Sequence, residues 1–231
     1  MGGRMIDSLV QAARLLASGD REVYFIAWTS LWMSIASVAL AAVISLPLGF
    51  LLGLAEFRAK RPIVAVLNTF MALPTVVVGL LVYAFLSRSG PLGFLGLLFS
   101  PPAVIVGQTV LCLPLIASLV YSALSRTDRR LPETLVTLGA SRRQVFWMTL
   151  REARVAILSA LLAGFGRLIG EVGVSMMLGG NIRWYTRTLT TAIALETSKG
   201  EFELGLALGA ILMAIAFLVN VGLHGVVRHG D

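Results

Sequence analysis

Two ionisable residues, Arg167 and Glu171, interrupt an apolar run that extends from Val155 to Leu178. Residues four apart lie on the same face of a helix, so the guanidinium and the carboxylate are expected to pair. Charged groups at membrane depth are costly and rarely face lipid, which leaves two interpretations of this pair. Either it is an internally neutralised contact that fixes helix packing, or Arg167 attracts a divalent oxyanion while Glu171 limits its affinity.

The segment with the most informative polar spacing runs from Leu131 to Gln144. Glu133 suits the first turn of a helix, where a negative charge meets the positive end of the helix dipole. Gly139 suits a left-handed C-cap, and Ser141 with Gln144 has the spacing of a capping box for a second helix. The segment therefore predicts a two-turn helix, a glycine elbow and another helix. A helix this short is marginal alone, so the segment is either an ordinary interfacial loop or an element that docks into a partner groove.

Few other side chains in the sequence suggest chemistry. Cys112 is the single cysteine, and the two histidines, His224 and His229, lack the company of a metal-ligand cluster. The sequence contains neither a phosphate-binding Gly-rich loop of the Walker A kind nor a His-Glu-x-x-His run. We therefore expect no catalytic residue, no metal and no cofactor, and we expect any ATP hydrolysis to take place in another chain.

The composition is typical of a membrane protein. Hydrophobic residues make up 57% of the 231 residues and charged residues 13%, and the mean hydropathy is +0.87. A soluble globule of this size lacks the interior to bury so much apolar surface, which excludes a soluble enzyme. The net charge of +7 does not indicate a nucleic-acid partner, because membrane proteins use Lys and Arg to set their orientation.

Five apolar runs are each long enough to cross a hydrocarbon core of about 30 Å as a helix. They are expected at about residues 23–55, 62–87, 103–125, 155–178 and 204–227. Pro47, Pro74 and Pro114 lie inside three of these runs and are expected to bend them. The predicted fold class is an all-α membrane protein with five transmembrane helices in one domain over residues 23–227, with a cytoplasmic loop at 126–154.

Residues 1–20 have a different pattern, which predicts an amphipathic helix lying at the membrane surface. Its apolar face is expected to carry Ile6, Leu9, Val10, Ala13 and Leu16. Asp20 is the expected N-cap of the first span. Eleven of the nineteen Lys and Arg residues lie on the side of the loop at 126–154. The positive-inside rule therefore predicts that the N-terminus is outside and that this loop and the C-terminus are cytoplasmic.

From Glu133 through Gly139, Ala140 and Ser141 to Phe146, the loop resembles the EAA loop of type I ABC importer permeases. Thr134-Leu135 stands where that family has an Ala pair, and Glu152 stands where it often has Pro. Six other segments are similar to the oxyanion branch of the family, which comprises molybdate, tungstate and sulfate permeases. They are residues 164–173, 179–182, 186–189 and, closest to the tungstate subgroup, 72–80 and 190–197 with 150–154.

The resemblance implies a type I importer permease in a prokaryotic inner membrane, acting as a homodimer. Its implied partners are two cytoplasmic ABC ATPase subunits and an extracytoplasmic substrate-binding protein, and its implied cargo is a tetrahedral oxyanion, closest to tungstate. The ATPase-coupling loop would then include Glu133, Leu138, Gly139, Ala140 and Ser141. Molybdate or sulfate is the alternative cargo. A different class, an ion-coupled secondary transporter, is disfavoured because five helices do not divide into two equal inverted repeats.

The outer part of this arrangement holds further candidates. Met176 and Met177 suit a gate, although Met at helical positions more often fills gaps in packing. Arg183 and Arg187 give positive charge to residues 181–203, which suits anion steering, contact with a binding protein, or a solvated loop. A short helix is expected at 188–197. In the fourth span, Gly164, Gly166, Gly170 and Gly173 suggest close helix packing rather than a lining of the pathway, and the four-residue spacing of Gly166 and Gly170 fits the small-xxx-small pattern.

Overall fold

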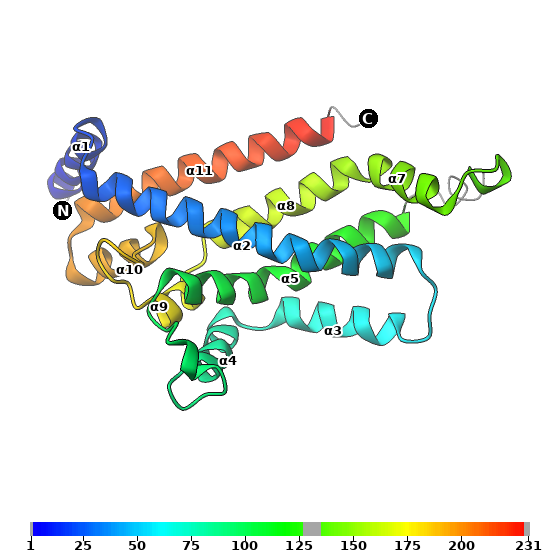
Figure 1. Ribbon diagram of the computed structural model, residues 1–231. Coiled ribbons are helices and arrows are strands. Elements are labelled where there is room, and N and C mark those ends of the chain that lie inside the picture. Colours follow the sequence, from blue (N-terminus) through cyan, green and yellow to red (C-terminus); the bar gives the residue numbers. More distant parts are fainter. Residues whose placement is uncertain (1, 127–134, 229–231) are drawn as a thin grey trace.

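The computed structural model describes residues 2–126 and 135–228, which are mostly helical and contain no strand (Figure 1). The helices are α1 (Gly2–Ala17), α2 (Arg21–Leu54), α3 (Lys60–Ala72), α4 (Thr75–Leu86), the short 3₁₀ turn η1 (Gly93–Leu95), α5 (Pro101–Arg126), α7 (Arg142–Glu152), α8 (Arg154–Ile169), α9 (Gly173–Gly179), α10 (Leu189–Lys199) and α11 (Phe202–Arg228). The prediction of an all-α protein is confirmed.

Three helices, α2, α5 and α11, are continuous and apolar enough to cross a membrane. The second and fourth predicted spans are instead broken: α3 meets α4 at 102°, and α8 meets α9 at 63°. The described residues therefore hold five candidate spans when each bent pair is counted as one. The bend expected at Pro74 is present, whereas the break between α8 and α9 was not expected.

Local chemistry explains both breaks. Pro74 lacks an N–H and disfavours a helical residue before it, and Leu73 is accordingly extended at the end of α3. Pro47 and Pro114, by contrast, lie inside helices that continue past them. At the second break Gly170 ends α8, and two non-helical residues precede α9. A proline in a predicted span therefore marks a break at only one of three positions.

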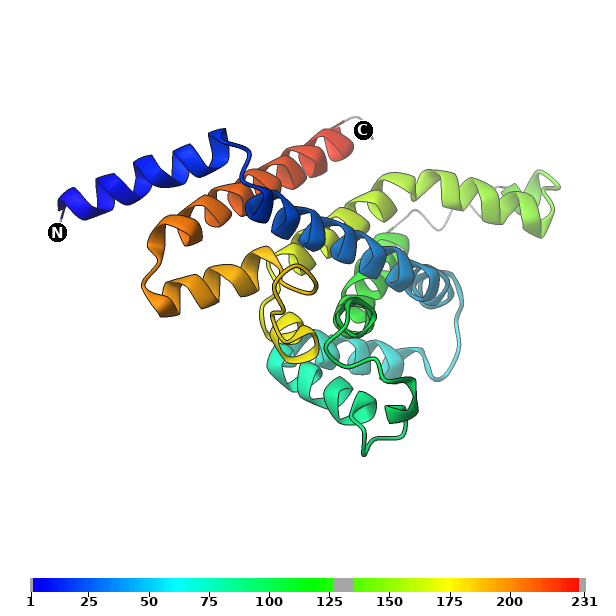
Figure 2. The ribbon, with the colours of Figure 1, turned by 60° about the vertical axis from the view of Figure 1, so that its left-hand side comes forward.

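The central helix of the bundle is α5, which contacts α2, α3, α4, α8 and α9 (Figures 1 and 2). Its apolar side chains Cys112, Ile116 and Val120 are buried against α2 and α8. On the periphery, α11 leaves Met213, Phe217 and Leu218 between 67% and 75% exposed. Such an exposed apolar surface suits contact with lipid or with other membrane-embedded chains.

Glycine allows the closest helix contacts. A Cβ added at Gly49 of α2 would lie 2.8 Å from Cβ of Val120, and one at Gly164 of α8 would lie 2.9 Å from Sγ of Cys112. Of the four glycines named for the fourth span, Gly164 and Gly173 make close contacts within the chain, whereas Gly166 and Gly170 do not. A Cβ at Gly166 would make an ordinary contact of 3.5 Å, and a Cβ at Gly170 would meet nothing within 4 Å.

The N-terminal helix is confirmed as α1, which packs against α11. Ala12 is buried, and the side-chain amide nitrogen of Gln11, in the orientation that satisfies its hydrogen bonds, donates to the Glu203 carboxylate at 2.9 Å. Val10 stays 47% exposed, so part of the expected apolar face is free of α11. Asp20 caps α2 as predicted, accepting from the backbone N–H of Glu22 at 2.9 Å.

We predict that Gly49→Ala destabilises the protein. Because Val120 is β-branched and lies against backbone, the added methyl group overpacks the α2–α5 contact, and overpacking typically costs about 1–3 kcal/mol. The matched control is Gly209→Ala on α11, where an added Cβ meets nothing within 4 Å. For Gly209→Ala the free energy of unfolding is expected to rise by about 0.4–1 kcal/mol, because alanine has fewer conformations than glycine in the unfolded chain. Thermal unfolding in detergent measures both, and equal midpoints for the two variants would contradict the packing assignment.

Candidate functional site

The two broken spans meet where α4 packs against α9. A Cβ at Gly79 of α4 would lie 3.0 Å from the Met177 sulfur, and a Cβ at Gly173 of α9 would lie 3.0 Å from the Thr75 hydroxyl oxygen. The first residues of both short helices therefore lie close together. This junction, formed by α4, α9 and the break before α9, is the candidate functional site.

The charge pair lies at this junction. The Arg167 guanidinium is 3.4 Å from the Glu171 carboxylate, as expected from their spacing. Glu171, however, lies in the break and not on the face of α8, and its side chain is 3% exposed against 48% for Arg167. Its second oxygen accepts a hydrogen bond from the backbone N–H of Val174 at 3.3 Å. The carboxylate thus neutralises a cation and satisfies the first turn of α9.

Other distant segments hold the two ends of α9. The Thr190 hydroxyl donates to the backbone oxygen of Glu171 at 2.7 Å. At the other end, the N–H of Phe99 donates to the Leu178 carbonyl at 2.9 Å, and the Thr186 hydroxyl donates to the Gly179 carbonyl. Unpaired backbone groups are strongly disfavoured at membrane depth, so these contacts allow a seven-residue helix to exist there.

A buried row of polar side chains ties α9 to the centre of the bundle. The Ser37 hydroxyl of α2 donates to the Gln108 amide oxygen of α5 at 2.9 Å, and the Gln108 amide nitrogen donates to the Ser175 hydroxyl of α9 at 3.1 Å. All three residues are at most 1% exposed. Sequence reasoning missed this row, although Gln108 is the single amide side chain between Ser89 and Ser125.

The two methionines of α9 differ in their surroundings. Met177 faces Gly79 of α4, whereas Met176 is 36% exposed. Val172 lies one turn before Met176 and is 39% exposed. Met176 is therefore placed to contact whatever lies against the open side of the junction, and Met177 fills space within the chain.

The expected outer cations belong to an ionic cluster. Arg183 donates to the Glu22 carboxylate from Nε at 2.8 Å, and Arg187 lies 3.4 Å from Glu22 and 3.9 Å from Glu196. Lys199 also contacts Glu196 at 3.1 Å. The hydrogen bond to Glu22, together with the charge of that carboxylate, raises the pKa of Arg183 above its usual value. The carboxylates offset much of the positive charge that the sequence suggests.

The residues from Thr188 onward form α10 as expected, but their surroundings are not those of a solvated loop. Thr188 caps the helix in a capping box with Thr191, and both are buried. The Leu189 backbone N–H donates to the Ser30 hydroxyl of α2 at 2.6 Å. This polar end of α10 is therefore part of the core that supports the junction.

The elbow around Gly139 has the predicted geometry where it is described. Gly139 has φ +82°, and its N–H donates to the Val136 carbonyl at 3.0 Å while that of Ala140 donates to Leu135 at 2.9 Å. This pair of bonds is a Schellman motif. Ser141 and Gln144 form the capping box of α7. Glu133 lies outside the described residues.

The elbow presents apolar side chains at its surface. Leu138 is 78% and Trp147 56% exposed. Both line a hollow of about 530 Å³ together with Gly139, Ala140 and Arg143. In Figure 1, α7 projects at one end of the bundle, while α1, α9 and α10 lie toward the other. No group of metal-ligating side chains occurs among the described residues.

A family model described as "Binding-protein-dependent transport system inner membrane component" matches residues 45–229. The chain is 40% identical over 213 residues to the tungstate uptake system permease protein TupB of Peptoclostridium acidaminophilum, covering 92% of this chain and 93% of that protein. It is 44% identical over 214 residues to a probable anion ABC transporter permease protein of Haloferax volcanii, covering 89% and 92%.

Among solved structures, the fold is similar to that of the MetNI methionine ABC transporter in inward-facing conformations. The TM-score is 0.72 at 23% identity, over 88% of this chain and 94% of that chain. The fold is therefore that of a type I ABC importer permease, as the EAA-like loop implied. By its family match and its relatives, the chain is an inner-membrane component of a binding-protein-dependent transport system and belongs to that family of ABC importer permeases.

Proposed function

We propose that this chain is the permease subunit of an ATP-driven importer for a tetrahedral oxyanion, with tungstate as its main cargo. The observation that carries the proposal is the 40% identity, over nearly the whole of both chains, to a permease named for tungstate uptake. The chain's own architecture supports the class: three helices are long and apolar enough to cross a membrane, and two bent helix pairs meet where α4 packs against α9.

The proposed assembly is a homodimer with two ATPase subunits inside and a binding protein outside. Five spans enclose a pathway poorly, so a second copy related by two-fold symmetry completes it. In this orientation the elbow at Leu138 and Gly139 is cytoplasmic and the ionic cluster around Glu22 is outside. Support comes from the excess of Lys and Arg on the elbow side.

The proposed transport step moves α9 relative to α4. Each ATPase subunit binds the exposed Leu138 side chain and the hollow beside it in one copy of the permease. When the two ATPase subunits close on each other, they tilt α7 and α8. Since Glu171 follows α8 directly and caps α9, the tilt reaches the junction through the backbone and through this carboxylate. A dianion needs water or polar donors throughout its path, and alternate opening of the junction supplies a wet route from either side.

In this proposal the pair of Arg167 and Glu171 is a packing contact and not an oxyanion site. Glu171 already accepts from the Val174 N–H and neutralises Arg167, so an incoming dianion would have to displace a buried carboxylate. Such displacement leaves the carboxylate without a partner in a poorly hydrated place, which is unfavourable.

The direct test of the function is reconstitution with the ATPase and binding protein. We expect ATP turnover to be stimulated most by binding protein loaded with tungstate, less by molybdate and least by sulfate. Uptake of labelled oxyanion should require ATP. Oxyanion uptake by the permease alone, or stimulation only by a different solute class, would contradict the proposal.

We predict that Gly139→Pro uncouples ATP hydrolysis from uptake. Proline cannot adopt φ +82° and removes the N–H that reaches Val136, a strain of about 3 kcal/mol that lowers the population of the elbow by about a hundredfold. Gly139→Asn is the matched control, since asparagine tolerates the left-handed region. The asparagine variant should retain most uptake per ATP hydrolysed. If the proline variant imports as much oxyanion per ATP hydrolysed as the unmodified chain, the elbow does not couple ATP hydrolysis to uptake.

We also predict that Arg167→Ala harms the protein more than the double variant Arg167→Met with Glu171→Gln. The single change leaves the Glu171 carboxylate buried without its cation, and the double change removes both charges while keeping an acceptor for Val174. Because Arg167 is 48% exposed, the expected difference is about 1–3 kcal/mol, less than for a fully buried pair. Thermal unfolding and uptake are measured together. Equal loss of uptake in two stably assembled variants would instead favour a direct role of Arg167 in anion binding.

A further inference from the structure

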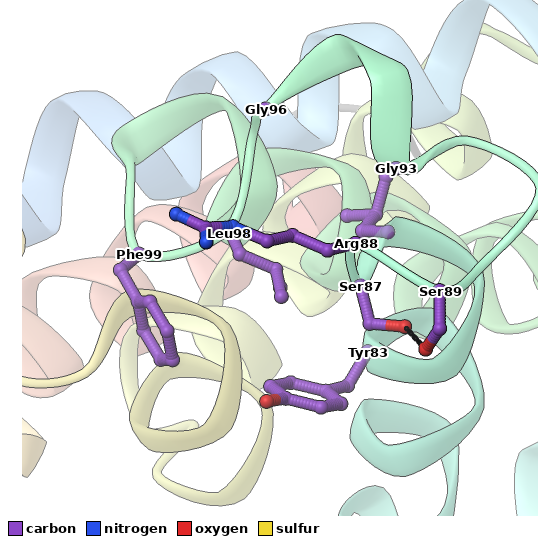
Figure 3. A pocket seen from close by; sticks show the side chains of 9 residues that line it. Tyr83, Ser87, Arg88, Ser89, Gly93, Gly96, Leu98 and Phe99 are labelled. Carbon is purple, nitrogen blue, oxygen red and sulfur yellow. Dashed lines mark hydrogen bonds between the residues drawn. The ribbon is translucent and has the colours of Figure 1, made fainter.

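A hollow of about 560 Å³ lies beside the C-terminal end of α4 and the loop that leads to α5 (Figure 3). Arg88 extends across the hollow toward Phe99, and Tyr83 lies on the wall below it. The hydroxyls of Ser87 and Ser89 lie at the other end, 3.3 Å apart. One cation and three hydroxyl groups therefore line a space that neither the junction nor the elbow uses.

Arg88 has no carboxylate partner within the described part of the chain. No Asp, Glu, Lys or other Arg occurs between Pro62 and Ser125 either, so no neighbour in sequence could pair with it. The other cations on this face differ, because Arg183 and Arg187 both contact Glu22. A guanidinium offers a planar fork of donors that fits the oxygens of an oxyanion, and the Tyr83 hydroxyl can add a donor. The Ser87 hydroxyl donates to the Ala84 carbonyl at 3.1 Å, which leaves it to accept from Ser89.

The loop that carries Arg88 is folded tightly onto the end of α4. The Leu92 N–H donates to the Phe85 carbonyl at 3.0 Å, and the Gly90 N–H donates to the Ser87 carbonyl at 2.8 Å. A Cβ at Gly90 would collide with the Ala84 carbonyl oxygen, so this fold requires glycine there. The backbone of Arg88 is thus held in place before any ligand arrives, which reduces the entropy lost on binding.

The wall of the hollow is also attached to α9. Phe99 adopts φ +60°, a left-handed conformation that is unusual for a bulky residue. Its N–H donates to the Leu178 carbonyl at 2.9 Å, and its ring lies edge-on to Tyr83 with centroids 6.3 Å apart. A Cβ at Gly180 would lie 2.8 Å from this ring. Phe99 therefore contacts both the hollow and the end of α9.

We propose that this hollow is a weak outer binding site for a free tetrahedral oxyanion dianion, on its way from the binding protein to the junction. The inference rests on the proposed import function and names a place where the cargo binds. Each water occupies about 30 Å³, so the hollow has room for the anion and several of its waters. Weak, hydrated binding suits a site that must release its ion inward.

A thiol-protection experiment tests binding directly. Leu98→Cys places a reporter in the wall of the hollow, and the native Cys112 is buried. In the purified permease, millimolar tungstate should slow modification of this cysteine by a membrane-impermeant thiol reagent severalfold. Arg88→Gln in the same background should abolish the protection. Ser18→Cys is the control. It lies on the exposed turn between α1 and α2, and tungstate should not slow its modification. Protection that is absent, or that persists without Arg88, would overturn the proposal.

A kinetic experiment in the assembled transporter separates the site from a docking contact. With Arg88→Gln, the maximal rate of tungstate uptake should fall about tenfold or more, while the concentration of loaded binding protein that gives half-maximal rate stays unchanged. Arg88→Lys should restore part of the rate, and Arg14→Gln on α1 should match the unmodified chain. A change only in the half-maximal concentration would show that Arg88 binds the binding protein's own carboxylates instead. An inactive unmodified complex would refute the proposed function, whereas an active complex unaffected by Arg88→Gln would refute this site alone.

Discussion

The structure depends on one constraint: a helix that breaks within a membrane must find partners inside the protein for the backbone groups it exposes. The fourth span breaks after Gly170, and the seven residues of α9 remain helical because other elements bind both of their ends. The Glu171 carboxylate accepts from Val174 at the start, and Phe99 donates to Leu178 at the finish. The contact from Phe99, like that of the Thr190 hydroxyl with the Glu171 backbone oxygen, comes from a separate part of the chain, so the conformation of α9 depends on how those parts are arranged.

This dependence is the physical basis of the role in transport that we propose for the broken spans. A continuous helix such as α5 keeps its backbone bonds whatever its neighbours do, whereas α9 would have to exchange partners if its neighbours moved. The row from Ser37 through Gln108 to Ser175 then fixes one side of α9 to the stable helices. A short element fixed on one side and capped by movable groups on the other is suited to switch between two discrete positions.

Sequence reasoning predicted the features whose partners lie within a few residues of each other. The Asp20 cap, the left-handed Gly139 and the Ser141 box were all expected, because their hydrogen bonds close over two to five positions. Contacts between distant elements were missed: Gln108 and Ser175 are 67 positions apart, and Arg183 and Glu22 are 161 apart. The 102° bend at Pro74 was expected only as a bend, since its size is set by how α4 packs on α9. The resemblance of the loop to a known family, not the spacing of the charges, gave the transport class.

The central claim is that ATP binding and hydrolysis in the partner ATPases move α9 by way of the elbow, and accessibility of Met176 tests it most directly. In proteoliposomes with the ATPase and binding protein, Met176→Cys is modified by an impermeant thiol reagent added outside, first without nucleotide and then with ATP and vanadate. The buried Cys112 gives little background. The account predicts modification rates that differ severalfold between the two states. Identical rates, in a complex that hydrolyses ATP and imports its oxyanion, would contradict it.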